Sequence, residues 1–332
     1  MADPKALVVA AERVFTIRKG LALGGKVAIT CACFWYVFRQ IKIGEILHEA
    51  DNLDIRWLAL ATIFAAAQVP LVGLRWARIA NALEPESPPV PLRTMLSINM
   101  IGTFFAQILP NVMSDALRIW LLSKIRGGWQ KGLASVAIDR GVGVGILLTI
   151  GVVTLANGSA FSALAGYRKA AFVTFAALLI GGIGGLVSAP IYAPLLTRNR
   201  FTTWMGEFAL ASRQVLIQSP AAISIVAIAF VVHFLSIADI WCLGRAFSMP
   251  LSVVDAAVLF TLILAIALIP VTVNGWGLRE LAVTAFLNAH GVPSQRALLL
   301  SICFGMTLVA AALPGAIVLP FYSFRKVRRP AI

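Results

Sequence analysis

Two short segments of the chain, residues 108–118 and 268–280, hold the residue types best suited to chemistry inside a membrane. In each segment a proline ends an apolar run, a polar turn follows, and a Leu-Arg pair comes next. Hydrocarbon cannot satisfy the backbone groups that such a break sets free, so the break must be buried in protein or line a watery cavity. Matching breaks in two halves of a chain indicate the substrate site of a transporter-like membrane protein. The residues that make the breaks are Pro110, Pro270, Gly275 and Gly277.

The arginines near these breaks point to phosphate chemistry. A planar guanidinium suits bidentate hydrogen bonds to phosphate oxygens, so Arg118, Arg140 and Arg279 are predicted to cluster around a lipid phosphate. Nearby acids balance this charge or contact a cationic or hydroxylated headgroup, and amides and hydroxyls add neutral hydrogen bonds. The predicted headgroup site comprises Arg118, Arg279, Asp115, Glu280, Arg140, Asp139, Asn99, Asn111, Ser114, Asn274 and Trp276, with Trp276 as a plug between two glycines.

The same residues have a structural interpretation, in which they pair with one another to pin the breaks or mark helix ends. Asp115 and Arg118 are three residues apart and share a helix face, so they are expected to pair. Arg279 and Glu280 are adjacent and are expected to point in different directions, which leaves one of them to face a ligand.

Composition places these residues in an integral membrane protein. Hydrophobic residues make up 60% of the chain and charged residues only 13%, against about 25% in a typical soluble domain. Segment 20–39 is apolar, has no small-residue cleavage site, and is expected to be an uncleaved anchor. The net charge of +14 is spread over span ends and forms no basic domain, which argues against a nucleic-acid partner. Further apolar windows of spanning length occur at 57–74, 94–114, 141–167, 170–197, 214–238, 256–278 and 297–324.

Basic residues orient the spans. With both termini in the cytoplasm and each broken segment entering and leaving by one face, most of the 28 Lys and Arg residues fall in cytoplasmic segments, Arg75 among them. Asp139 and Arg140 then begin the third span, where a charge can snorkel at low cost. Trp76, like several other tryptophans, falls near a predicted span end, as in an interfacial aromatic belt.

This topology predicts an all-α polytopic membrane protein with an inverted repeat. The chain forms one integral membrane domain, residues 1–332, with repeat 1 at about 20–157 and repeat 2 at about 170–324. Each repeat holds three transmembrane helices and one re-entrant helical hairpin, and an offset of 160 residues carries Pro110 to Pro270. The alternative is eight plain spans, some of them kinked.

No catalytic constellation stands out. The sequence has no HExxH, GxSxG, P-loop or Asp-rich diphosphate motif, so no enzyme activity, metal or cofactor is predicted. For His233 and Asp239, six residues apart, a proton relay and a core histidine bonded to a backbone carbonyl both stay open, and the second is favoured. The cysteines fit no zinc or redox motif and are expected to pack as small apolar residues: Cys31, Cys33, Cys242 and Cys303.

The order of these motifs resembles that of a known family. Asn99, Leu109-Pro110, Ser114-Asp115, Arg118, Asp139-Arg140 and the run from Gly275 to Glu280 are together similar to the membrane region of bacterial lysylphosphatidylglycerol synthase/flippase proteins. In two-domain members that region is assigned to moving aminoacylated lipid between leaflets, and a soluble C-terminal domain makes the lipid. This chain ends at Ile332 without such a domain, so it is not expected to make the lipid. The family has a glycine-rich turn after Leu-Pro, whereas this chain has a polar turn at 111–114. This difference affects the expected identity of the lipid headgroup more than it affects the expected fold.

The resemblance and the residues together predict a lipid flippase that moves a polar-headed phospholipid or glycolipid across the bacterial inner membrane. In this prediction Arg118 and Arg279 hold the phosphate, Asp115 and Glu280 set the polarity, and Arg140 supports them. The alternatives are a membrane-embedded glycosyl or acyl transferase that acts on a lipid carrier, and a scaffold for a lipid-synthesis complex. Besides the lipid, the partners considered are a lipid-synthesising enzyme and a second copy of the chain.

Overall fold

The computed structural model describes residues 53–109, 111–156, 165–199, 202–267 and 275–322, and the predicted span at 20–39 lies outside them. Within these ranges every regular element is a helix. Five helices of the described part of the chain, α3, α6, α7, α9 and α12, are long and apolar enough to cross a membrane. The helices of the described ranges are α3 (Ile55–Ala82), α4 (Leu92–Ile108), α5 (Asn111–Arg126), α6 (Trp129–Ala156), α7 (Ala165–Thr197), α8 (Thr203–Arg213), a π-helical turn (Gln214–Gln218), α9 (Ala222–Ala246), α10 (Val253–Ala267), α11 (Leu278–Ala289) and α12 (Ser294–Phe321).

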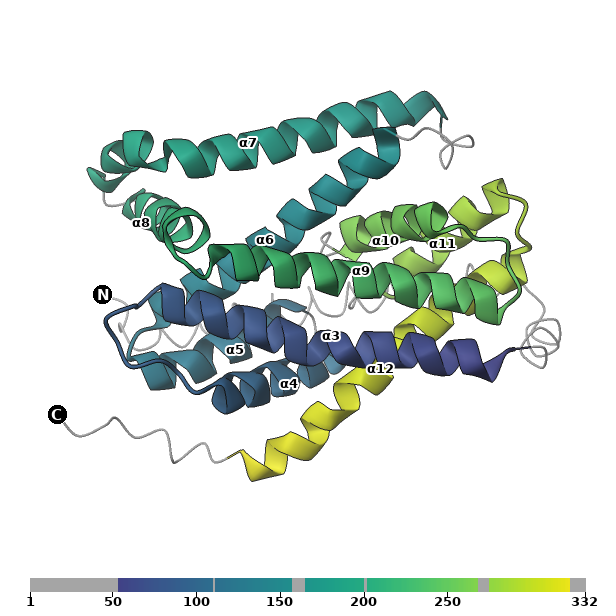
Figure 1. Cartoon of the computed structure of the whole chain (residues 1–332), viewed down its shortest axis with the longest axis horizontal. Helices are drawn as coiled ribbons and strands as arrows, with labels where there is room; N and C mark the ends of the chain where they lie inside the picture. The colour runs from purple at the N-terminus through teal and green to yellow at the C-terminus, as the bar shows by residue number, and fades with distance from the viewer. Residues whose placement is uncertain (1–52, 110, 157–164, 200–201, 268–274, 323–332) are drawn as a thin grey trace, which may run out of the picture.

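Helices α3 and α9 form the most extensive helix pair and run antiparallel through the middle of the molecule (Figure 1). At one end the backbone N–H of Asp54 donates to Ala246 O at 3.0 Å. At the other end the Gln214 side chain donates to Ala82 O at 3.0 Å. Asp54 also caps α3, because its carboxylate accepts the Arg56 N–H that has no partner within the first turn. The short helices pack near the two ends of this pair.

Two pairs of short helices lie at opposite ends of the α3–α9 pair. Helices α4 and α5 begin and end beside the last turn of α3, where Asn81 accepts hydrogen bonds from Val90 N and from the Arg126 guanidinium. Helices α10 and α11 begin and end at the other end, where Leu251 and Val292 join one apolar cluster. Gly275 and Gly277 have φ of +79° and +86°, a conformation that favours glycine, and they form a non-helical turn directly before α11.

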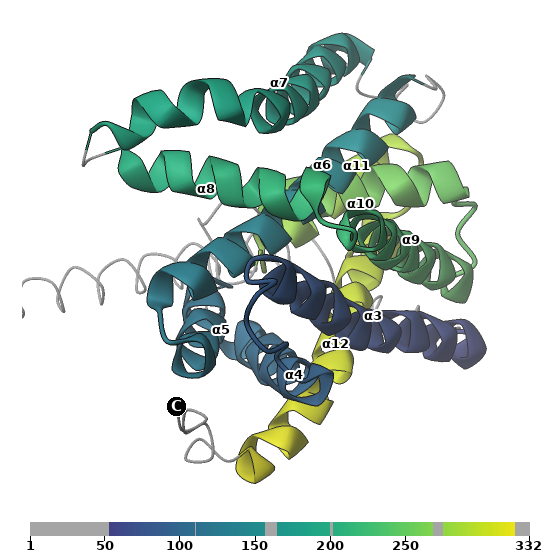
Figure 2. The same cartoon turned by 60° about the vertical axis from the view of Figure 1, so that its left-hand side comes forward.

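Helices α6 and α12 extend from these short pairs. Helix α6 packs on α5 and α10, and α12 packs on α11 and α4. The approach of α12 to α4 is close, since a Cβ at Gly315 would overlap the carbonyl of Met100. Figures 1 and 2 show α7 at the edge of the molecule, on the far side from α4 and α12 and packed on α8. The apolar side chains of α7 are mostly exposed, as expected of a helix surrounded by lipid.

Candidate functional site

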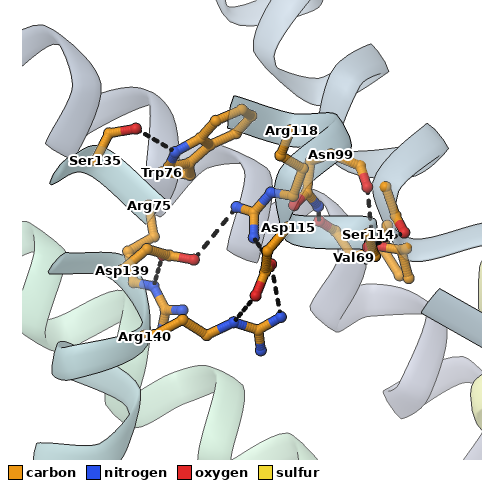
Figure 3. A network of polar contacts seen from close by, with 12 residues as sticks. Val69, Arg75, Trp76, Asn99, Ser114, Asp115, Arg118, Ser135, Asp139 and Arg140 are labelled. Carbon is orange, nitrogen blue, oxygen red and sulfur yellow. Dashed lines mark hydrogen bonds and ion pairs between the residues drawn. The ribbon is translucent and has the colours of Figure 1, made fainter. Parts of the chain in front are cut away.

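Five charged side chains from three helices form a continuous series, which we call the ion chain: Arg75, Asp139, Arg118, Asp115 and Arg140 (Figure 3). Arg75 Nε lies 2.8 Å from Asp139 Oδ1, and Arg118 Nη2 lies 3.3 Å from Asp139 Oδ2. Arg118 Nη1 is 3.5 Å from Asp115 Oδ1, which confirms the predicted pairing. Arg140 binds the same carboxylate with two nitrogens, at 3.0 and 2.9 Å. Acids and arginines therefore alternate along the series.

Helix geometry places these groups together. Arg75 comes from α3, Asp115 and Arg118 share a face of α5, and Asp139 and Arg140 come from α6. The stem of Arg118 crosses α4 at Gly102, where a Cβ would come within 2.8 Å of Arg118 Cγ. A glycine at this position lets a long side chain pass between two helices.

A tryptophan fixes the position of the Arg118 guanidinium. The ring of Trp76 lies 4.3 Å from Arg118 Cζ, within the range of a cation–π contact. Trp76 is fully buried, and its Nε1 donates to Ser135 Oγ on α6 at 3.1 Å. The expectation that Trp76 belongs to an interfacial belt is therefore wrong, because its ring is enclosed by helices.

The ion chain carries a net positive charge and opens at one end only. Three guanidinium groups meet two carboxylates, so one positive charge is in excess. The Arg118 side chain is 6% exposed, whereas that of Arg140 is 53% exposed. Two buried donors, Arg75 Nη1 and Arg118 Nε, have no hydrogen-bond acceptor in the described part of the chain. The excess charge is thus accessible at Arg140.

Arg75 is the member of the ion chain that the sequence prediction missed. The charge-free window of the sequence ends just before Arg75 and predicts a cytoplasmic position for it, but α3 continues to Ala82 and buries Arg75. Asp139 and Arg140 were expected at the start of a span, and this is also wrong because α6 begins at Trp129. Asp139 is buried in the body of α6, where a partner on α3 neutralises it.

A second charged group lies at the start of α11 and consists of Arg279 and Glu280, which we call the closed pair. Arg279 Nε is 2.9 Å from Glu280 Oε1, and Glu280 Oε2 accepts the Gly277 N–H at 2.5 Å. Ser301 on α12 donates to Glu280 Oε1 at 3.2 Å. The ring of Trp276 lies 4.4 Å from Arg279 Cζ. One guanidinium and one carboxylate give the closed pair no net charge, and burial of both side chains leaves no exposed guanidinium.

The prediction that one member of the closed pair is free to face a ligand is wrong. The two side chains leave the helix in different directions, but the long arginine folds back onto the neighbouring carboxylate. The predicted cluster of three arginines does not form among the described residues either. Arg118 and Arg140 share Asp115, whereas Arg279 is held against α12, where a Cβ at Gly305 would contact its guanidinium.

Two neutral residues of the predicted site bind backbone instead. Asn99 Nδ2 donates to Val69 O at 2.9 Å and so joins α4 to α3 next to the internal Pro70. Ser114 Oγ donates to Gly102 O at 2.6 Å and joins α5 to α4. Both side chains are buried, so their role here is to hold the first short pair together.

Several predicted residues fall outside the described ones. They are Pro110, Pro270 and Asn274, together with the side chain of Asn111, whose backbone begins α5. Within the described ranges no three His, Cys, Asp or Glu side chains come together in a group that could hold a metal ion. The prediction for His233 is confirmed, because its Nδ1 lies 2.8 Å from Ala229 O.

Comparison with known proteins gives one informative match. The family model described as the lysylphosphatidylglycerol synthase TM region matches residues 24–315, which include the ion chain and the closed pair. No curated protein and no solved structure matches the chain. Because the match covers most of the sequence, the chain belongs to the lysylphosphatidylglycerol synthase transmembrane-region family.

Proposed function

We propose that the protein moves a lipid with an anionic, phosphate-bearing headgroup between the two leaflets of the bacterial inner membrane. Family membership supports a lipid-related function in a membrane. The observation that carries the more specific proposal is the excess positive charge of the ion chain, which is exposed at Arg140. Charges inside spans are costly and normally serve a substrate or ion pathway.

The geometry of Arg140 suits a phosphate group. Its Nε and Nη2 bind Asp115, so Nη1 is the nitrogen that does not bind this carboxylate, on a side chain that is 53% exposed. A phosphate oxygen can bind Nη1 first and then compete with Asp115 for the rest of the guanidinium. Displacement of Asp115 would free it for Arg118, which stands at 3.5 Å. In this proposal Arg140 makes the first contact with the headgroup and Arg118 balances the charge behind it.

The path for the headgroup follows from the short helices. Helices α4, α5, α10 and α11 have 17, 16, 15 and 12 residues, and at about 1.5 Å per residue none reaches the roughly 30 Å of a bilayer core. Each pair therefore suits a hairpin that enters and leaves by one face. The chain enters and leaves the α4–α5 pair at one end of α3 and α9, and it enters and leaves the α10–α11 pair at the other end. This arrangement supports an inverted repeat with α3–α6 matching α9–α12.

Leaflet exchange in proteoliposomes tests this proposal. Vesicles of phosphatidylethanolamine and phosphatidylglycerol carry a fluorescent phosphatidylglycerol, and an impermeant quencher reports how much of it stays in the outer leaflet. We expect Arg140→Ala to slow exchange by about tenfold or more, because a hydrogen bond to a charged group contributes about 1.5–3 kcal/mol. The matched control is Arg93→Ala, which removes an exposed arginine at the start of α4.

The same assay separates the rival functions. A chemically altered lipid would support a transferase, and neither exchange nor product would support a scaffold. If Arg140→Ala and the parental protein exchange lipid at equal rates, the headgroup site is assigned wrongly. Arg118→Ala is expected to slow transport as well, whereas Arg279→Ala removes a guanidinium enclosed with Glu280 and is expected to act mainly on stability. Arg140 is the sharper test, because removal of either buried arginine also leaves a buried acid with fewer partners.

A further inference from the structure

One buried acid takes no part in the ion chain or the closed pair. Asp239 lies in α9 with 0% of its surface exposed, and its carboxylate faces α12. Its hydrogen-bond partner is the hydroxyl of Thr307, which lies 3.1 Å from Oδ2 and 3.5 Å from Oδ1. No Lys, Arg or His of the described ranges forms an ion pair with it, although both helices are long enough to span a membrane. A buried carboxylate without a counter-charge is strongly disfavoured in its ionised form.

Counting protons at Thr307 gives the protonation state of this acid. A threonine hydroxyl has a single hydrogen to donate. Its shortest contact is 2.8 Å to Phe304 O, within its own helix. With the hydrogen directed there, the 3.1 Å contact to Asp239 Oδ2 is a hydrogen bond only if the carboxyl group donates. The arrangement is therefore satisfied when Asp239 carries a proton and forms the series Asp239 to Thr307 to Phe304 O.

The described helices that pack on α9 place no charged side chain against Asp239. Helix α3 contributes Gln68, whose Oε1 accepts from Ser236 Oγ, one turn before Asp239. Helix α12 adds Thr307 and, one turn before it, a thiol, and α9 adds a second thiol one turn after Asp239. Among the described residues, no charged side chain of α6, α10 or the π-helical turn forms a hydrogen bond or ion pair with this carboxyl, which contacts Thr307. The titratable groups that share this region are Cys242, Cys303 and, nearly two turns away on α9, His233.

The position of Asp239 links it to both charged groups. Thr307 follows Gly305 by two residues, and Gly305 lies against Trp276 and Arg279 of the closed pair. In the other direction along α9, His233 lies 3.9 Å from the Cβ position of Gly143, one turn beyond Arg140 on α6. A rearrangement at the contact of α9 with α12 can therefore reach the surroundings of both groups.

We propose that Asp239 is a proton-binding site whose loading and release drive lipid movement, an inference that rests on the proposed function. On release, the carboxyl O–H bond breaks, the electron pair stays on the carboxylate, and a water molecule accepts the proton. The Thr307 hydroxyl then turns its hydrogen from Phe304 O to the new carboxylate. On loading, the proton returns to Asp239 and Thr307 bonds Phe304 O again. The ligand of this site is a proton, so no co-reactant other than water is needed.

Infrared spectroscopy tests the proton site independently of transport. A protonated carboxylic acid gives a C=O absorption that a carboxylate lacks. We expect this band in the purified full-length protein at neutral pH, its loss in Asp239→Asn, and its retention in Asp255→Asn. Asp255 is a partly exposed acid that accepts hydrogen bonds from Ser252 at the start of α10, so it is a matched control. Identical spectra for the parental protein and Asp239→Asn would overturn the proposal.

A second variant, Thr307→Val, tests the hydrogen bond of Asp239 while Asp239 itself stays in place, so the test does not depend on the folding of Asp239→Asn. Thr307→Val removes the acceptor of the carboxyl O–H and keeps the shape of the side chain. We expect the band to persist and move to higher frequency, because the O–H loses its hydrogen bond. An unmoved band would show that Asp239 does not donate to Thr307, and the inference would fail.

Coupling between proton binding at Asp239 and lipid exchange is measured in the proteoliposome assay with and without a pH gradient. The measured quantity is the ratio of the two lipid-exchange rates for each variant. We expect this ratio to exceed unity for the parental protein and Asp255→Asn, and to fall to unity for Asp239→Asn. An Asp239→Asn ratio equal to the parental ratio would refute the coupling. A parental protein with the infrared band but no lipid exchange in either condition would refute the proposed function and leave the proton site standing.

Discussion

Asp139 is the residue on which the ion chain depends most, because it compensates two buried arginines at once. In Asp139→Asn the amide keeps one oxygen for Arg75 Nε, at 2.8 Å in the parental protein. Its NH₂ group would then face the Arg118 guanidinium, and both groups can only donate. Arg118 retains Asp115, but Arg75 retains no acid among the residues that the structure describes. Loss of one partner from a buried pair costs about 3–5 kcal/mol, so we expect a loss of this size in the free energy of unfolding.

The assay is denaturant unfolding in mixed micelles, followed by tryptophan fluorescence and by far-ultraviolet circular dichroism. Asp115→Asn is the matched control, because its carboxylate bonds mainly to the half-exposed Arg140, and exposed pairs contribute about 1 kcal/mol or less. The double variant Asp139→Asn with Arg75→Met removes both members of the buried pair and should recover part of the loss. A loss in Asp139→Asn no larger than that in Asp115→Asn would refute this account of the ion chain.

Two further changes test the packing and the closed pair. Gly315→Ala should destabilise the protein, because the new methyl group would overlap the Met100 carbonyl on α4, whereas Gly181→Ala in α7 meets open space and should leave thermal stability in detergent unchanged. Glu280→Ala leaves the Arg279 guanidinium buried without its acid and should lower the free energy of unfolding by about 3–5 kcal/mol; unfolding at the parental denaturant concentration would contradict this.

The sequence predicts the helices and the breaks of this fold better than it predicts the ends of the spans. Apolar windows locate α3, α6, α7, α9 and α12, and the glycines before α11 mark a true interruption. A window without charges ends at the first charged residue, however, whereas a helix continues if a neighbouring helix neutralises that charge. Arg75 and Asp139 neutralise each other in this way, so α3 extends past one predicted end and α6 begins before the other.

The sequence predicts only some of the contacts in the candidate site, for a related reason. The pairing of Asp115 with Arg118 follows from helix periodicity, which a sequence shows directly. The contact between Arg75 and Asp139 depends on how α3 crosses α6, and 64 residues separate the two in sequence. Periodicity also fails for the closed pair, because the flexible stem of Arg279 can fold back on its neighbour whatever the direction of its Cβ.

The distribution of ion pairs along the chain has a consequence for biogenesis. All members of the ion chain lie between residues 75 and 140, and the closed pair is formed by adjacent residues, 279 and 280. Ribosomes release the chain from its N-terminus, so the acids and arginines of the ion chain can neutralise one another before α9 has been translated. The two buried arginines of the ion chain, Arg75 and Arg118, therefore have their acid partner before synthesis of the second half. Later synthesis of α9–α12 adds an apolar cluster, the closed pair and the contact of Asp239 with Thr307.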